Sequence, residues 1–120
     1  VPLHEDPVAR RRIAQLATQL EVARMLQRRV IASASQGGVP TVESSMYKLY
    51  MTQFGQRLAN TALDLMGHEG LLKPGQHGAP ENGRFERSYR YTVVDTIGGG
   101  TSEIQKNIIA QRGLGLPRNF

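Results

Sequence analysis

The sequence has no cysteine and no tryptophan, and it has only three phenylalanines among 120 residues. Without cysteine, the chain can form neither a disulfide nor a thiolate metal site, which fits a reducing compartment. We expect a bacterial cytoplasmic location, with the mitochondrial matrix as the alternative. Because 39% of the residues are hydrophobic and few of these are aromatic, the core should be aliphatic and helical.

Long hydrophobic runs are also missing from this chain. No run reaches the roughly 18 apolar residues that a membrane span requires, and no signal-peptide pattern opens the sequence. The three histidines lie far apart, so we expect no metal site. The chain begins at Val1, and Val1–Glu5 resemble a linker, so we expect a piece of a larger protein.

The chain is basic, with a net charge of +5 and a sequence pI near 10.1. The densest clusters are Arg10–Arg12 and Arg28–Arg29. Such clusters form a solvated helix face or bind nucleic acid, acidic lipid or a polyphosphate cofactor. Because no aromatic residues are interleaved with them, we expect a solvated face and no nucleic-acid partner.

Two long helices are predicted in the first half of the chain. Asp6 and Pro7 are typical of a helix start, and the apolar pattern continues to about Gln36. Thr41 is predicted to cap a second helix that ends at Met66. At 1.5 Å per residue each helix is roughly 40 Å long. The predicted apolar positions are Ile13, Leu16, Leu20, Ala23, Val30 and Ala34 in the first helix, interrupted by Gln27, and Met46, Leu49, Tyr50, Phe54, Leu58, Ala62 and Leu65 in the second.

The second half predicts a loop over residues 67–83 and two shorter helices, Arg84–Ile97 and Ser102–Arg112. Ser102 and Gln105 have the spacing of a capping box. No strand pattern and no internal repeat is evident. We therefore expect an all-α fold, an antiparallel bundle of two long and two shorter helices, as a single partial domain over residues 1–120. The long helices would overhang so small a domain, which favours a larger assembly.

Three glycines, Gly98–Gly100, lead into a hydroxyl pair and an acidic residue, Thr101–Glu103, where the last helix begins. Free N–H groups and the positive end of the helix dipole gather at such a start, which suits a phosphate or a carbonyl oxygen. A plain helix–helix turn would explain the same pattern. The turn at Gly67–Gly70 has the same two interpretations, either a helix end with a surface histidine or a backbone turn that contacts a ligand.

The segment Ile97–Arg112, followed by Gly115–Pro117, resembles the end of the C-terminal helical domain of the flavin-dependent acyl-CoA dehydrogenases, which commonly reads I-Y-E-G-T-S-E-I-Q-R-N-I-I-A-E-R before G-L-P. Asp64–Gly70 is similar in outline to the family's Q-I-F-G-G-N-G segment. The resemblance covers essentially the whole chain. It implies the latter part of the third domain of a tetrameric flavoenzyme, without the N-terminal helical domain and the middle β domain.

In this family a carboxylate removes the α-proton of an acyl-CoA and a hydride passes to FAD, which yields the 2-enoyl-CoA. Reoxidation by an electron-transfer flavoprotein-like acceptor is implied as well. The resemblance implies that Gly99 and Gly100 border the thioester and the flavin. Gly70 would complete the upstream turn. The resemblance further implies contacts to FAD from Thr101, Ser102 and Glu103, and to the FAD of a neighbouring subunit from Asp64, Leu65, Met66, Gly67 and His68.

The sequence departs from the family pattern at the catalytic base. Gly99 stands where many members have the glutamate base, and Glu103 does not replace it, because members that keep the base also have that residue. We expect the base upstream of Val1. In the alternative, this chain is a non-catalytic subunit that completes a partner's site in a heteromer. The acyl chain, whether fatty, branched or a steroid side chain, and the choice between homotetramer and heterotetramer stay open.

Further departures fall in the upstream turn and the last two helices. Asp64 stands for the usual glutamine, and His68–Glu69 stand for the usual Gly-Asn. Tyr91 and Gln111 replace acidic residues. Asp64 and Glu69 add negative charge near the expected pyrophosphate, which opposes the contact to a neighbouring FAD.

Overall fold

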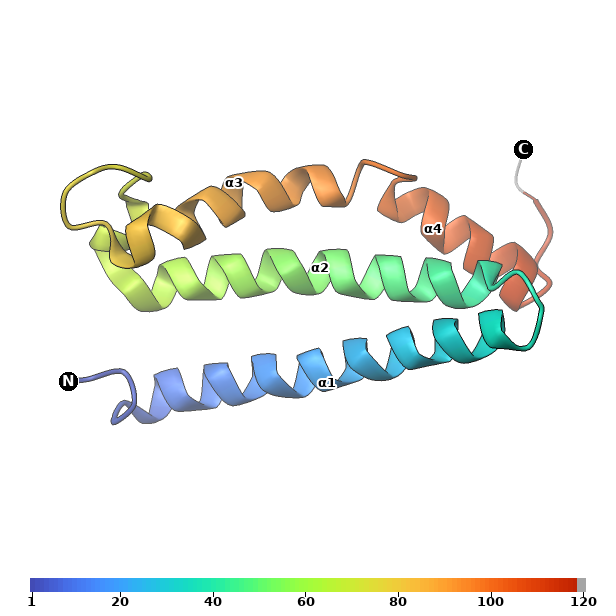
Figure 1. Ribbon diagram of the computed structural model, residues 1–120, viewed down its shortest axis with the longest axis horizontal. Helices are drawn as coiled ribbons and strands as arrows, with labels where there is room; N and C mark the ends of the chain where they lie inside the picture. The colour runs from blue at the N-terminus through green and yellow to red at the C-terminus, as the bar shows by residue number, and fades with distance from the viewer. Residues whose placement is uncertain (119–120) are drawn as a thin grey trace.

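The computed structural model describes residues 1–118 and contains four α-helices. They are α1 (Pro7–Ser35), α2 (Thr41–Met66), α3 (Arg84–Asp95) and α4 (Ser102–Ile108). Residues 1–118 include no strand. The expected all-α fold of two long and two shorter antiparallel helices is therefore confirmed (Figure 1).

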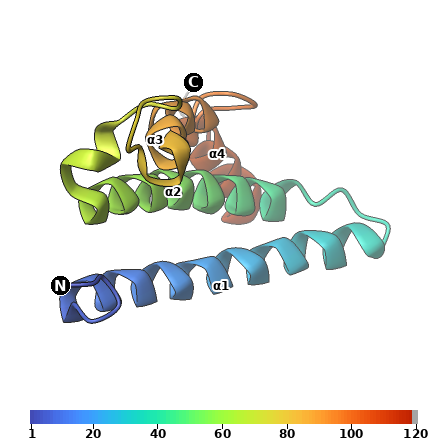
Figure 2. The same ribbon diagram turned by 60° about the vertical axis from the view of Figure 1, so that its left-hand side comes forward.

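Helix α2 is the central element of the bundle. It packs against α1 on one side and against α3 and α4 on the other (Figures 1 and 2). Its glycine, Gly55, lies against the side chain of Thr92 on α3, where an added Cβ would be 3.8 Å from the threonine methyl. The result is an elongated molecule that measures 51 × 28 × 26 Å.

The predicted start of α1 is confirmed, whereas that of α2 is corrected. The carboxylate of Asp6 caps α1 by accepting a hydrogen bond from the amide of Val8 at 2.9 Å. At α2 the capping position is Pro40, and no side chain caps the helix. The Thr41 amide donates to the carbonyl of Val39 at 2.8 Å, and its hydroxyl points back to the same oxygen. The threonine is therefore already inside the helix.

The last two helices also differ from prediction at their ends. Helix α3 ends at Asp95, two residues before the predicted Ile97. The capping box of Ser102 and Gln105 is wrong, because Thr101 caps α4 through its hydroxyl, which accepts from the Ile104 amide at 3.2 Å. Beyond Ile108 the chain stays helical but widens into a π-helical turn, η3 (Ile109–Gly113), which packs on α2.

The predicted loop over residues 67–83 contains two 3-10 turns, η1 (Gly67–Leu71) and η2 (Pro80–Gly83). Gly70 is buried in the first turn, and an added Cβ there would lie 2.9 Å from the Cβ of Met66. The loop is thus packed against the end of α2, and close packing requires the glycine.

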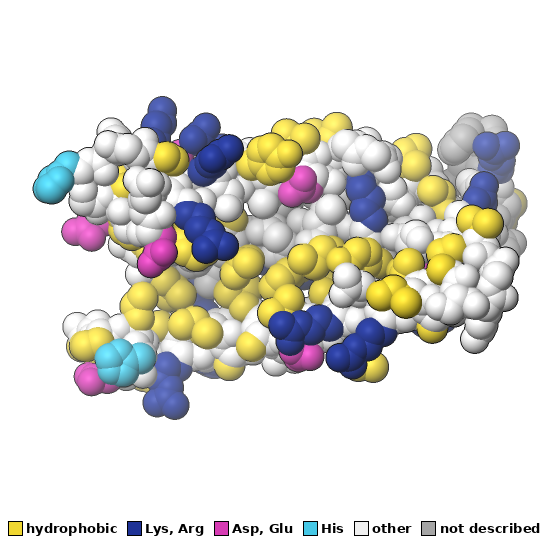
Figure 3. Space-filling model, in the orientation of Figure 1, with side chains coloured by type: hydrophobic (Ala, Val, Ile, Leu, Met, Phe, Trp, Pro, Cys, Tyr) yellow, Lys and Arg dark blue, Asp and Glu magenta, His cyan; other side chains and the backbone are white. Residues whose placement is uncertain are grey.

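The core is small for four helices. The buried hydrophobic residues are Ala9, Ala23, Phe54 and Ala59. Three residues on the predicted apolar faces are not buried, because Ile13 is 48% and Leu58 37% exposed and Ala34 is exposed as well. Figure 3 shows hydrophobic side chains along the middle of one face, with lysine and arginine side chains around them. Each helix therefore buries only part of its apolar surface within this chain.

Replacing Gly83 by alanine tests how tightly the loop packs. Gly83 has φ +73°, and an added Cβ would lie 2.3 Å from the backbone nitrogen of Pro74. Gly78 has φ +79° with no atom within 4 Å, so it is the matched control. A positive φ costs an alanine about 1–2 kcal/mol at either site, and the clash at Gly83 adds about 1–3 kcal/mol. We expect Gly83→Ala to lower the urea midpoint clearly more than Gly78→Ala in unfolding followed by circular dichroism; equal losses would contradict this packing.

Candidate functional site

The glycine run forms a turn that joins α3 to α4. Gly99 and Gly100 have φ values of +68° and +97°, which residues with a side chain rarely adopt. The turn is closed by the Ser102 amide, which donates to the carbonyl of Thr96 at 3.0 Å. Gln56 of α2 also donates to the Thr96 hydroxyl at 3.2 Å, so the turn is fixed to the central helix.

The carbonyl groups of this turn are held by two side chains. Lys48 Nζ of α2 donates a hydrogen bond to the carbonyl of Gly100. Gln105 Nε2 of α4 donates to the carbonyls of Gly99 at 3.3 Å and Gly100 at 3.4 Å. Gln105 is only 6% exposed. Its side chain thus holds the turn instead of completing a capping box.

Three consecutive amide groups of the same turn have no hydrogen-bond partner among residues 1–118. Within the described part of the chain, the N–H groups of Gly99, Gly100 and Thr101 donate to no acceptor. Gly99 is exposed, and an added Cβ there would meet nothing closer than Lys48 Cε at 3.9 Å. Successive unpaired amides before a helix can receive a carbonyl or phosphate oxygen. The Thr101 hydroxyl already caps the helix, and the Glu103 side chain is exposed.

The second group of predicted residues surrounds the end of α2. Gly67 has φ +66° and ends the helix, and His68 follows it, exposed to solvent. Asp64 forms an ion pair with Arg12 of α1, with 2.8 Å between the guanidinium nitrogen and the carboxylate oxygen. One arginine of the basic cluster therefore offsets the negative charge that Asp64 adds to this turn.

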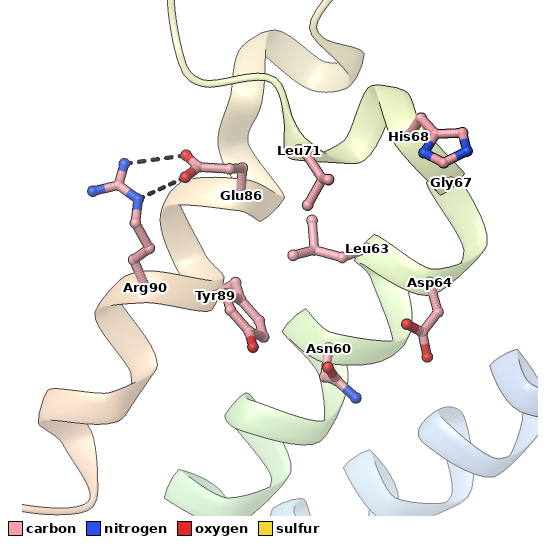
Figure 4. Close-up of a pocket in the computed structure, with 9 residues that line it drawn as sticks. All are labelled: Asn60, Leu63, Asp64, Gly67, His68, Leu71, Glu86, Tyr89 and Arg90. Atoms are coloured by element: carbon pink, nitrogen blue, oxygen red, sulfur yellow. Dashed lines mark hydrogen bonds and ion pairs between the residues drawn. The ribbon is translucent and has the colours of Figure 1, made fainter.

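A pocket of about 540 Å³ opens beside this turn (Figure 4). Asp64, Gly67 and His68 line it, whereas Leu65, Met66 and Gly70 do not. Figure 4 shows Leu63, Leu71 and Tyr89 directed toward its interior. The residues of the pocket that the sequence did not indicate are Asn60, Leu63, Leu71, Glu86, Tyr89 and Arg90.

Glu86 and Arg90 form the charged wall of this pocket. Two hydrogen bonds join them, Arg90 Nε to Glu86 Oε1 at 2.6 Å and Arg90 Nη2 to Glu86 Oε2 at 3.1 Å. The hydrogen bonds from Arg90 lower the pKa of the Glu86 carboxyl, and those to Glu86 raise the pKa of Arg90. Their four-residue spacing on a helix is the sequence signal that could have identified this pair.

The structure does not bring the two groups of predicted residues together. Lys48, beside the glycine turn, and Asp64 are sixteen residues apart on α2, which corresponds to roughly 24 Å along a helix. The two groups therefore form separate surfaces. Among the described residues, no group of three histidine or acidic side chains could hold a metal ion. Within the same residues, no helix has both the length and the apolar character needed to cross a membrane.

Comparisons with known proteins agree on one family. The family described as "Acyl-CoA dehydrogenase, C-terminal domain" matches residues 1–114. The acyl-CoA dehydrogenase IpdE1 of Mycobacterium tuberculosis is 36% identical over 118 residues, which cover 95% of this chain and 28% of the relative. The chain thus spans little more than a quarter of that relative's length.

Two solved structures resemble this chain closely. The Tcur3481-Tcur3483 steroid ACAD has a TM-score of 0.92 and 28% identity, over 98% of this chain and 30% of the matched one. The ChsE4-ChsE5 complex from Mycobacterium tuberculosis has a TM-score of 0.88 and 28% identity, over 97% of this chain and 30% of the matched one.

The Glu86–Arg90 pair predicts an acid-dependent contribution to stability. The pKa of Glu86 is lower in the folded protein than the ordinary value of 4.5. The ionised Glu86 carboxylate therefore adds to the free energy of unfolding in full above that value, and this contribution is lost as pH falls through the folded-state pKa. We expect Glu86→Gln to lower the urea midpoint at neutral pH, with the difference from the parent protein vanishing in acid.

Glu21→Gln is the matched control for this measurement. Glu21 is paired with Arg24 on the surface, with side chains 62% and 55% exposed. Exposed pairs contribute little to stability, so we expect a small change at any pH. A Glu86→Gln difference that is independent of pH would contradict the role of the carboxylate.

Proposed function

This chain belongs to the acyl-CoA dehydrogenase family, and from that membership we propose that it is the C-terminal helical part of a flavin-dependent acyl-CoA dehydrogenase. In that role it provides contacts to FAD and to other subunits. The observation that carries the proposal is the glycine turn at the start of α4. Side chains hydrogen-bond the carbonyls of Gly99 and Gly100, and the amides of Gly99–Thr101 have no partner among the described residues. The remaining segments of the enzyme come from outside these 120 residues.

The glycine turn suits a flat cofactor and a thioester. Bound FAD would supply the hydride acceptor for the α,β-dehydrogenation of an acyl-CoA to the 2-enoyl-CoA. Gly99 and Gly100 present no side chain, so a ring or a thioester can approach their backbone. The amides there can donate to a carbonyl oxygen, while Thr101, Ser102 and Glu103 lie at the helix start, where an anionic or polar group is favoured.

The turn after α2 is proposed to contact the FAD of a neighbouring subunit. Its separation from the glycine turn along α2 supports a second binding surface. The Arg12–Asp64 ion pair supports it further, because the arginine offsets the charge that would oppose a pyrophosphate. The residues proposed for this contact are Asp64, Leu65, Met66, Gly67 and His68, with Gly70 as the packed base of the turn.

The proton-abstracting base is proposed to come from another segment. Gly99 has no side chain, and the nearby Glu103 is exposed in the first turn of α4. Since two solved structural relatives are described as two-component assemblies, Tcur3481-Tcur3483 and ChsE4-ChsE5, we carry a second candidate. In it, this chain belongs to a subunit that lacks the base and completes a partner's site. Because the first of these relatives is described as a steroid ACAD, a steroid side-chain acyl-CoA is a substrate to test beside fatty and branched ones.

Flavin reduction tests the first proposal. We expect the complete polypeptide that carries this chain to bind FAD and to lose flavin absorbance when an acyl-CoA is added under anaerobic conditions. The 120 residues alone should show no such reduction, because the base and most of the cofactor site are missing. A complete protein without flavin would refute the proposal, and flavin reduction by the 120 residues alone would refute the assignment of the base.

Subunit composition separates the two candidates. We expect the complete protein, purified alone, to form a homotetramer with dehydrogenase activity if another segment supplies the base. If the chain belongs to a base-lacking subunit, activity should appear only after co-expression with a second acyl-CoA dehydrogenase chain. Native mass spectrometry of active material, with two unlike masses or one, decides between them.

A further inference from the structure

We propose that Lys48 and Gln105 are positioning residues, which aim the amides of Gly100 and Thr101 at a ligand carbonyl oxygen. This inference rests on the proposed function, because it takes the glycine turn to face the flavin and the thioester. It assigns roles to two side chains that act through the peptide groups they hydrogen-bond. One belongs to the central helix α2 and the other to α4.

The geometry of the peptide group carries the first step. In a trans peptide the carbonyl and the following N–H point in opposite directions, and the described chain has no cis peptide bond. Gln105 Nε2 holds the carbonyl of Gly99, so the Gly100 amide points away from Gln105. Lys48 Nζ and Gln105 Nε2 hold the carbonyl of Gly100, so the Thr101 amide points away from both. Neither amide has a partner within the described residues.

The charge of Lys48 carries the second step. A hydrogen bond from a cation to a carbonyl is stronger than one from a neutral donor, and it polarises the peptide group to which that carbonyl belongs. The N–H of this peptide is the amide of Thr101. Lys48 therefore makes that amide a better hydrogen-bond donor. The hydrogen bond from this amide becomes stronger when negative charge develops on the accepting oxygen.

Close approach of Gln105 explains one of the glycines. A Cβ on Gly100 would lie 2.6 Å from Gln105 Nε2, in a backbone conformation with φ +97°. A side chain at this position would displace the glutamine amide from both carbonyls. Gly99, by contrast, has open space, with Lys48 Cε as the nearest atom at 3.9 Å. The glycine at position 100 thus allows Gln105 to hydrogen-bond the turn, whereas the glycine at position 99 leaves room for a ligand.

The accepting carbonyl belongs either to the thioester or to the flavin ring, and kinetics distinguish them. In the complete flavin-loaded enzyme, we expect Lys48→Met to lower kcat about tenfold or more, because a positioned donor at developing charge is commonly worth that much, with little change in KM. If the ligand is the flavin carbonyl, the dissociation constant of FAD rises instead and the visible flavin spectrum shifts.

Matched variants control for charge and folding. Lys48→Arg keeps the cation and should restore most of the lost activity. Lys106→Met removes a charge from an exposed lysine beside Gln105 on α4 and should behave as the parent enzyme. Thermal unfolding of each variant identifies general destabilisation. An unchanged kcat, FAD affinity and flavin spectrum in a folded Lys48→Met enzyme would overturn the proposal.

A second measurement does not depend on activity. Labelling glycine carbonyl carbon and threonine nitrogen selects the Gly–Thr peptide groups of the complete protein in an NMR spectrum. Gly100–Thr101 is the one such pair in these 120 residues, and its signal is the one that disappears in Gly100→Ala. We expect both nuclei to shift in Lys48→Met and in Gln105→Leu of the complete protein without FAD, but not in Lys106→Met. Absence of these shifts would mean that Lys48 and Gln105 do not fix this peptide group, and would overturn the proposal. A complete protein that shows these shifts but binds no FAD would refute the proposed function, while the hydrogen bonds from Lys48 and Gln105 to the turn would still be supported.

Discussion

The packing of α2 between α1 and the α3–α4 pair holds this molecule together. Helix α2 contacts α3 and α1 in different ways. Gly55 allows α3 to approach closely, whereas Arg57 and Asp64 reach α1 through polar contacts, Arg57 to Gln19 at 3.1 Å and Asp64 to Arg12. A change that displaces α2 would therefore disturb every other helix.

A bundle built around one helix leaves much apolar surface exposed. Met25 and Ile31 of α1 are 67% and 58% exposed, and Val93 and Ile97 near the end of α3 are 54% and 60% exposed. Exposed apolar side chains of this size, on several helices, are typical of interaction surfaces. The chain covers 28% of its relative IpdE1, and the proposed assembly would supply the missing neighbours.

The central helix also connects the fold to the proposed site. Lys48 and Gln56 of α2 both bind the segment that joins α3 to α4, at the carbonyl of Gly100 and the hydroxyl of Thr96. The glycine turn is therefore positioned by the bundle, although its sequence alone would allow many conformations. A binding surface of backbone amides depends on such support, because a flexible turn would lose its donor geometry.

Local sequence signals determined the helices and their class. The Asp6 cap, the glycine after each long helix and the apolar periodicity act within a few residues, so the all-α fold and the bounds of α1 and α2 could be predicted to within about two residues. The errors at Thr41 and Ser102 shifted a cap by one residue. The glycine turn and the turn after α2 were also identified from sequence. Only the tertiary structure decided what holds them, because Lys48 and Gly100, like Arg12 and Asp64, are 52 residues apart. No periodicity encodes such a contact, which exists only once α2 has packed against its neighbours.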